Sequence, residues 1–179
     1  SKPAFVDADN DGDMDLVIGS MGGGLTQYYE NTGNPTNPAY TRRPGTLNLF
    51  DGVDVGAWSA PSFVDVDNDG DTDLVIGTYE GDLKHYYENT DNPTNPAYTR
   101  REGAFNPFDV VADVGSYSAP AFVDTDNDGD MDLVIGRHKF PKAEGDLKFY
   151  YENTGSASNP SYTRREGALN PFDGVANVG

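Results

Sequence analysis

The chain has 179 residues, of which 36% are apolar, and it is rich in glycine (21) and proline (12). Its 30 acidic residues and 12 Lys and Arg give a net charge of −18, which opposes binding to polyanions such as nucleic acid or anionic membrane. The absence of cysteine excludes disulfides and thiolate zinc sites. No apolar run approaches the roughly 20 residues that a membrane-spanning helix needs.

Three near-identical segments dominate the sequence. They read PAFVDADNDGDMDLVIG, PSFVDVDNDGDTDLVIG and PAFVDTDNDGDMDLVIG, and they occupy residues 3–19, 61–77 and 120–136. Each is followed by YYENT and then by YTRR. Self-similarity at a fixed period is the signature of a repeat protein. We therefore expect three repeat units, at residues 1–58, 59–117 and 118–179.

The first repeat predicts four short strands. Phe5-Val6 leads into an aspartate-rich loop, and the continuous apolar run at residues 16–18, which leaves the loop, is typical of a strand covered on both faces. A glycine-rich turn precedes a third strand at residues 25–30. Two Asn-Pro pairs then break the chain before a fourth strand at 39–43, and residues 44–60 cross to the next repeat.

Four antiparallel strands in a unit of about 60 residues are the signature of a β-propeller blade, which must stack on its neighbours to bury both faces. We therefore predict an all-β fold of three tandem four-stranded antiparallel blades of the β-propeller type. An array of β-sandwiches or an open β-stack would fit the same strands. Because a closed propeller needs at least about four blades, we expect the chain to be part of a longer chain or of an assembly.

The loop between the first two strands of each repeat carries a carboxylate at every second position. Counted from Asp7, the carboxylates stand at positions 1, 3, 5, 7 and 9, with asparagine at position 4 and glycine at position 6. The asparagine suits a turn, and the glycine permits a sharp one. The fifteen candidate metal ligands are Asp7, Asp9, Asp11, Asp13, Asp15, Asp65, Asp67, Asp69, Asp71, Asp73, Asp124, Asp126, Asp128, Asp130 and Asp132.

Calcium is the ion that this pattern favours. It is a hard cation that takes 6–8 oxygen ligands in a flexible shell, whereas magnesium prefers a rigid octahedron and zinc prefers histidine and cysteine. The loop is not an EF-hand, because position 12 is isoleucine in all three copies and strands flank it. A solvated acidic turn would leave five carboxylates repelling one another. We therefore predict three bound Ca²⁺ ions, one per repeat.

The loop and the strand after it, D-x-D-x-D-G-D-x-D-L-V-I-G, resemble the repeat of integrin-like β-propellers, the FG-GAP family and its VCBS relatives. Val55-Gly56 and Val114-Gly115 replace the Phe-Gly of the name, which favours the VCBS side. The resemblance implies that each loop holds Ca²⁺ through the side chains at positions 1, 3, 5 and 9 and the carbonyl of position 7. It also implies an extracellular or cell-surface location.

No Ser/His/Asp constellation and no glycine-rich phosphate loop is present, so we do not expect an enzyme. The expected function is that of a calcium-stabilised extracellular module with a structural or adhesion role. Its partner would be a protein or glycan at the cell surface, or further copies of the chain, and not nucleic acid. Two alternatives stay open: a subunit of a surface filament built from such repeats, and a calcium-dependent propeller lectin.

Paired tyrosines and paired arginines recur in every repeat. The tyrosines could stack on sugars, but their strict repetition and placement on strands favour packing between blades. The arginines could bind an acidic ligand, but ion pairs within or between blades are the favoured interpretation. Trp58 and Tyr117, at matching positions, are also interpreted as packing residues. The pairs are residues 28–29, 86–87 and 150–151 for tyrosine, and 42–43, 100–101 and 164–165 for arginine.

Overall fold

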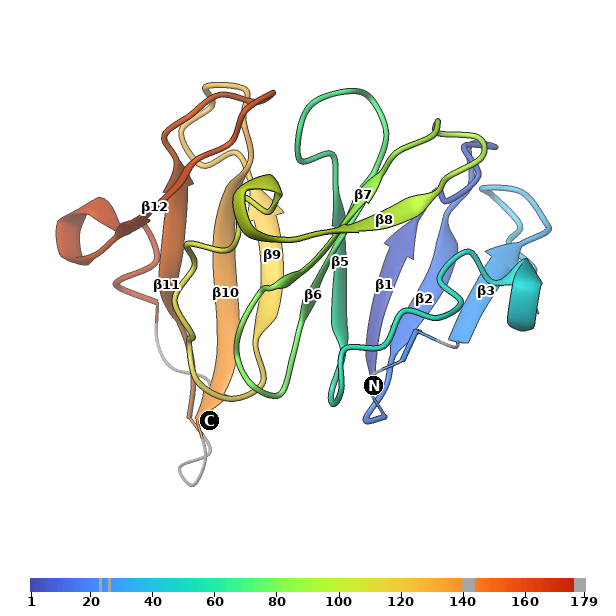
Figure 1. Cartoon of the computed structure of the whole chain (residues 1–179), viewed down its shortest axis with the longest axis horizontal. Helices are drawn as coiled ribbons and strands as arrows, with labels where there is room; N and C mark the ends of the chain where they lie inside the picture. The colour runs from blue at the N-terminus through green and yellow to red at the C-terminus, as the bar shows by residue number, and fades with distance from the viewer. Residues whose placement is uncertain (23, 26, 140–143, 176–179) are drawn as a thin grey trace.

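The structure, a computed structural model, describes residues 1–22, 24–25, 27–139 and 144–175. These residues form three separate four-stranded antiparallel sheets and three single-turn 3₁₀ helices, so the predicted all-β fold of tandem blades is confirmed (Figure 1). Within each sheet the strands lie side by side in chain order. Among the described residues, the structure has no helix with the length and hydrophobicity needed to cross a membrane.

Each sheet is called a blade below. Blade 1 consists of β1 (Lys2–Val6), β2 (Asp15–Gly19), β3 (Gln27–Asn31) and β4 (Tyr40–Arg42), followed by η1 (Gly45–Leu47). Blade 2 consists of β5 (Ala60–Val64), β6 (Asp73–Gly77), β7 (His85–Asn89) and β8 (Tyr98–Arg101), followed by η2 (Gly103–Phe105). Blade 3 consists of β9 (Ala119–Val123), β10 (Asp132–Lys139), β11 (Glu144–Asn153) and β12 (Tyr162–Arg165), followed by η3 (Gly167–Leu169).

The third repeat carries an insertion of residues 140–144 relative to the other two, and the hairpin on which it falls is longer. β10 and β11 have 8 and 10 residues, whereas β2 and β3 have 5 each. The extended pairing ends with Lys139 opposite Glu144, and a register shift lies between Ile135 and Arg137. The rest of the insertion, residues 140–143, lies outside the described residues.

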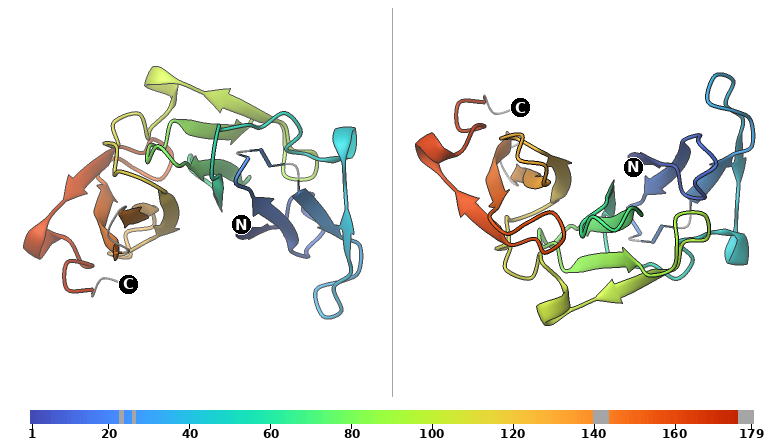
Figure 2. Two further views of the ribbon diagram at one scale, coloured as in Figure 1. Left: turned by 90° about the horizontal axis from the view of Figure 1, so that it is seen from below. Right: turned by 90° about the horizontal axis from the view of Figure 1, so that it is seen from above.

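The hydrophobic cores lie between blades rather than within them. Leu74, Val75 and Ile76 of β6 are all fully buried. Leu74 and Ile76 belong to the core shared with blade 1, and Val75 belongs to the core shared with blade 3. Strand β6 is therefore covered on both faces, as the continuous apolar run in the second strand of each repeat predicted. The first strands β1, β5 and β9 lie next to one another along the array (Figure 2).

A phenylalanine from each crossover segment packs between two blades. The side chain of Asn48 fixes its segment, because it donates a hydrogen bond to the carbonyl of Leu25 at 2.9 Å and accepts one from the N–H of Phe50 at 3.0 Å. The Phe50 ring then lies 5.5 Å from that of Phe63 and 5.0 Å from that of Tyr98, both in blade 2. The crossover therefore supplies apolar surface to the interface between blades.

A close backbone approach accompanies this packing at the end of the second strand. Gly19 and Gly77 leave no room for a side chain, since a Cβ atom would lie 2.1 Å from the carbonyl oxygen of Ser59 and 2.3 Å from that of Ser118, respectively. The serines belong to the start of the following blade and hydrogen-bond back across the approach. Glycine at the end of the VIG motif thus lets consecutive blades meet.

The tyrosine pairs contribute Tyr28, Tyr86, Tyr87 and Tyr151 to these cores, as favoured by the sequence. Their first members are buried in all three blades, and the second members Tyr87 and Tyr151 are buried as well. The arginine pairs form ion pairs within blades, also as favoured. Each second arginine makes two hydrogen bonds to a glutamate on the neighbouring strand, in the pairs Arg43–Glu30, Arg101–Glu88 and Arg165–Glu152.

Trp58 and Tyr117 pack against each other, with ring centroids 5.1 Å apart, as predicted for packing residues. Their environment was not predicted. Both residues have left-handed backbone angles, with φ of 59° and 62°, a strained conformation for bulky side chains. Tyr117 also contacts Tyr79 at 4.9 Å and His138 at 5.6 Å. The result is a partly exposed row of rings that extends along consecutive blades.

Candidate metal centre

The three aspartate loops lie at the same end of the array, each between the first and second strands of its blade (Figure 1). Strand pairing fixes the two ends of every loop. In blade 1, Val6 is opposite Asp15 in the antiparallel register, so positions 1 to 8 must form a tight connection between paired strands. The corresponding pairs in blades 2 and 3 are Val64–Asp73 and Val123–Asp132.

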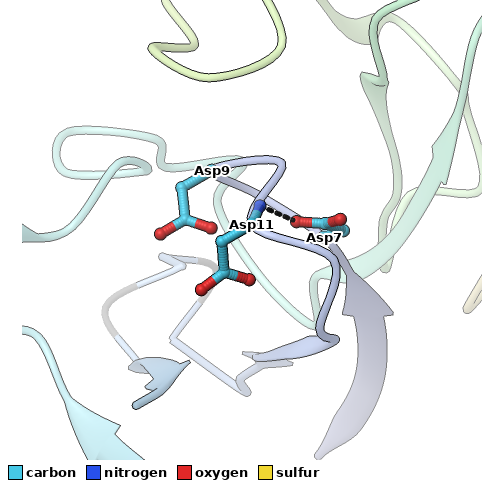
Figure 3. Close-up of side chains that lie close together, drawn as sticks. All are labelled: Asp7, Asp9 and Asp11. Atoms are coloured by element: carbon cyan, nitrogen blue, oxygen red, sulfur yellow. Dashed lines mark hydrogen bonds between the residues drawn. The ribbon is translucent and has the colours of Figure 1, made fainter. Parts of the chain in front are cut away.

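Positions 1, 3 and 5 come together in every loop. In the first, one carboxylate oxygen from each of Asp7, Asp9 and Asp11 lies within 4.8 Å of the other two. The side chains of Asp9 and Asp11 lie side by side, and Asp7 approaches from the other side of the turn (Figure 3). The same holds for Asp65, Asp67 and Asp69 and for Asp124, Asp126 and Asp128.

Backbone N–H groups hold the first loop in this shape. The two carboxylate oxygens of Asp7 accept hydrogen bonds from the N–H groups of Asp11 and Gly12, both at 3.1 Å, and Asp11 accepts one from Asp13 at 3.0 Å. Asn10 and Gly12 have φ of 57° and 96°, so both occupy the left-handed region that the turn requires. The roles predicted for positions 4 and 6 are therefore confirmed.

The aspartates at position 9 lie in a different environment. Asp73 is buried, and its Oδ1 accepts a hydrogen bond from the N–H of Asn89 at 2.8 Å. Its Oδ2 accepts hydrogen bonds from the N–H of Val66 and the hydroxyl of Tyr86, both at 3.1 Å. Asp15 and Asp132 make the corresponding bonds in their blades. Position 9 thus joins the loop to the third strand, and its metal ligation stays a prediction.

The side chains at position 7 are also buried, but two of them leave an oxygen unsatisfied. The Oδ1 atoms of Asp13 and Asp71 have no hydrogen-bond partner among the described residues, and neither does Oδ1 of Asp67 at position 3. A buried carboxylate oxygen without a donor costs free energy of roughly 1–3 kcal/mol or more. A cation bound beside positions 1, 3 and 5 would supply the missing partner, so the residues present fit a bound metal ion.

The electrostatics of the loops also favour a cation. Burial, followed by the negative charge of Asp11, raises the pKa of Asp9. Burial and the neighbouring carboxylates of the same loop raise the pKa of Asp71 and of Asp130 to about 6. These carboxylates are therefore poorly solvated and repel one another when ionised. A divalent cation would reverse both effects, because it stabilises the ionised form.

Sequence reasoning missed the residues that surround the loop. The tyrosine hydroxyl and the asparagine N–H that bind position 9 come from YYENT, and the glutamate of the same motif pairs with the second arginine of YTRR. The glutamate lies close enough to add to the negative potential of the loop, since Glu88 raises the pKa of Asp67, after burial and Asp69. Strict repetition of these motifs was the available signal, but it did not reveal which atoms meet.

We predict that Asp73→Asn destabilises the protein even without calcium. The amide would place an N–H₂ group opposite the N–H of Val66 and leave that donor unpaired, at a cost of about 1–3 kcal/mol in the free energy of unfolding. Asp67→Asn is the matched control, because it removes a repelling charge at a side chain whose buried Oδ1 has no hydrogen-bond partner among the described residues. Urea unfolding in EDTA measures both variants. Equal stability of Asp73→Asn and the parent chain would contradict the anchoring role of position 9.

We also predict that the calcium-free protein becomes less stable as the pH rises from about 5 to about 8. The folded-state pKa values of Asp71 and Asp130 are raised to about 6 and that of Asp73 to about 7. Because the folded state binds these protons more tightly than the unfolded chain does, protonation of the three groups stabilises the fold. Carboxyl groups of the unfolded chain titrate near 4, so this stabilisation is complete below about pH 4 and is lost as the pH rises through 6 to 7. The melting temperature in EDTA should therefore be higher at about pH 5 than at about pH 8.

In saturating calcium the same comparison should give the opposite order, because protons compete with the ion for the carboxylates. Differential scanning calorimetry at both pH values, with calcium and with EDTA, measures this reversal. A melting temperature that rises with pH under both conditions would contradict the electrostatic account of the loops.

The comparison with protein families agrees with the fold and the loops. A family model described as an FG-GAP-like repeat matches residues 7–76 and again residues 65–135. A search of curated proteins found no match. The two overlapping matches begin at position 1 of the first and second loops and together span well over half of the chain. The chain therefore belongs to the FG-GAP-like repeat family.

Proposed function

We propose that the chain is a non-enzymatic, calcium-stabilised repeat module of an extracellular protein, with a structural or adhesion role. One observation carries the calcium proposal: three separate loops bring the same three carboxylates together, and the first two loops also contain buried carboxylate oxygens that lack donors. A single acidic cluster would mean little. Its recurrence with the same hydrogen bonds, in a chain of this family, supports one ion in each loop.

The donor set supports calcium over other divalent ions. Each group consists of aspartates alone, and position 7 can add a further oxygen, so the ligands are hard and numerous. Calcium accepts an irregular shell of 6–8 oxygen ligands, whereas magnesium requires an octahedron and keeps its water molecules. Three divalent ions add six positive charges, which would change the formal net charge from −18 to −12.

The arrangement supports a fixed structural ion rather than a switch. The loop begins and ends in paired strands, and position 9 is tied to the third strand by buried hydrogen bonds. A calcium sensor needs an element that moves when the ion binds, such as the helix pair of an EF-hand. In this fold the ion would stabilise the connection between the first two strands of a blade and would relieve repulsion among its carboxylates.

A lectin is the second candidate function, and the exposed rings of Trp58 and Tyr79 favour it. Exposed aromatic rings offer sugars an apolar face to stack on, and strained backbone often accompanies functional surfaces. A glycan array probed with the parent chain and with Trp58→Ala, each with and without calcium, tests this candidate. Binding that is lost in the variant would support it, and the absence of glycan binding by the calcium-loaded parent would contradict it.

We predict that calcium raises the melting temperature strongly and that EDTA reverses the rise. A ligand at 100 times its Kd that binds only the folded state adds about 2.7 kcal/mol per site. Asp9→Asn, Asp67→Asn and Asp126→Asn should each remove about one third of the calcium-dependent increase. Asp109→Asn, an exposed aspartate outside the loops, is the control and should keep all of it. No change on adding calcium or EDTA to the parent chain would contradict the proposal.

A further inference from the structure

Aspartate precedes glycine at five places in the chain, and the structure gives these pairs different environments. Three of the pairs occupy positions 5 and 6 of the aspartate loops. The others are Asp51-Gly52 and Asp173-Gly174 in crossover segments, whereas the crossover between blades 2 and 3 has Asp109-Val110 at the same place. An aspartate before glycine is prone to rearrange, because glycine has no side chain to shield its nitrogen from the neighbouring carboxyl group.

In the aspartate loops both reactive groups are held by other partners. The N–H of Gly12 donates a hydrogen bond to Oδ2 of Asp7 at 3.1 Å, and Oδ1 of Asp11 accepts one from the N–H of Asp13 at 3.0 Å. The corresponding bonds in the second and third loops are all 3.1 Å long. The glycine nitrogen and the aspartate carboxylate are therefore directed at different groups, and the folded loop opposes their reaction with each other.

The pair Asp51-Gly52 lacks this protection. Both residues are exposed, in the crossover that blades 1 and 2 flank on either side. Within the part of the chain that the structure describes, neither the carboxylate of Asp51 nor the N–H of Gly52 has a hydrogen-bond partner. A Cβ atom added at Gly52 would meet no other atom within 4 Å, so the turn is open. The two groups that must react are thus adjacent, accessible to water and not engaged elsewhere.

We propose that Asp51 is a modification site, at which aspartate rearranges spontaneously to isoaspartate while the aspartates of the folded loops do not. The contrast between the crossover and the loops carries this proposal, because the same two residue types stand in both. It goes beyond the proposed function, and it depends neither on bound calcium nor on an adhesion role.

The rearrangement needs water alone. The nitrogen of Gly52 attacks Cγ of Asp51, the nitrogen loses its proton and the carboxyl group loses its hydroxyl, so one water molecule leaves and a succinimide ring forms. A water molecule then opens the ring at one of its two carbonyl groups. Opening at Cγ restores aspartate. Opening at the main-chain carbonyl gives isoaspartate, in which the main chain runs through the former side chain and the mass is unchanged.

Isoaspartate at this position would disturb the packing of blades 1 and 2, because it adds a methylene group to the main chain. The N–H of Val53 donates a hydrogen bond to the carbonyl of Phe50 at 3.1 Å, across the residue that lengthens. The longer main chain cannot keep this turn unchanged. Phe50 is 1% exposed, and its ring packs against Phe63 of the following blade. A displaced crossover would therefore loosen the interface to which Phe50 contributes.

Peptide mapping of the aged protein tests the proposal. The parent chain is incubated near neutral pH, in calcium and in EDTA, below its melting temperature in each buffer. It is then digested with a protease that cuts before aspartate but not before isoaspartate. Isoaspartate should accumulate at residue 51 in both buffers and stay low at residues 11, 69, 109 and 128. In urea, where the hydrogen bonds of the loops are lost, residues 11, 69 and 128 should rearrange as well.

Asp51→Glu is the matched control, because it keeps the charge but would have to close a larger ring, so the modification at residue 51 should be lost. The melting temperature of the aged parent should fall, and that of equally aged Asp51→Glu should not. The absence of isoaspartate at residue 51 of the folded parent, or equal amounts there and in the loops, would overturn the proposal. An aged parent that contains isoaspartate but melts like fresh protein would overturn its effect on the interface.

Discussion

The concentration of negative charge in three short loops is the constraint on which the rest of the structure depends. Five carboxylates stand within nine residues of each loop, and together the loops hold 15 of the 30 acidic residues. The fold deals with them in different ways. Position 1 accepts N–H groups of its own loop, and position 9 is buried under hydrogen bonds from the third strand. Position 5 accepts one N–H of its own loop, whereas buried oxygens at position 3 of the second loop and at position 7 of the first two loops lack donors, and a bound cation would supply the missing partner. The hydroxyl bond to position 9 explains why tyrosine recurs in YYENT. The asparagine recurs because its side-chain oxygen accepts backbone N–H groups of the loop between the third and fourth strands.

The second constraint is that no blade can cover itself. Both cores lie between blades, and the crossover phenylalanines Phe50 and Phe108 belong as much to the following blade as to their own. The loops and these interfaces act on different parts of each blade. The loops fix the turn between its first two strands, and the interfaces bury its faces. Bound calcium would therefore stabilise a blade independently of the packing between blades, so the two contributions can be measured separately.

The sequence predicted the blades and the grouping of carboxylates in the loops. It did not predict the contacts that depend on packing between strands and between blades. Period and strand number predicted the blades, and carboxylate spacing predicted the grouping of Asp7, Asp9 and Asp11. Local pattern could not predict that Asp15 would be enclosed by hydrogen bonds, since its partner Asn31 lies 16 residues away on another strand. Nor could it predict the left-handed backbone of Trp58 at the junction between blades. Short-range turn chemistry was accessible, and contacts between strands and between blades were not.

The central claim is that each loop holds one calcium ion through its grouped carboxylates, and counting ions tests it most directly. Native mass spectrometry of the calcium-loaded chain, with isothermal titration calorimetry for affinity, gives the number bound. The account predicts three Ca²⁺ per chain, and two for a variant in which Asp65 and Asp67 are both changed to asparagine. A chain that binds no calcium in solution, or a variant that still binds three, would contradict it.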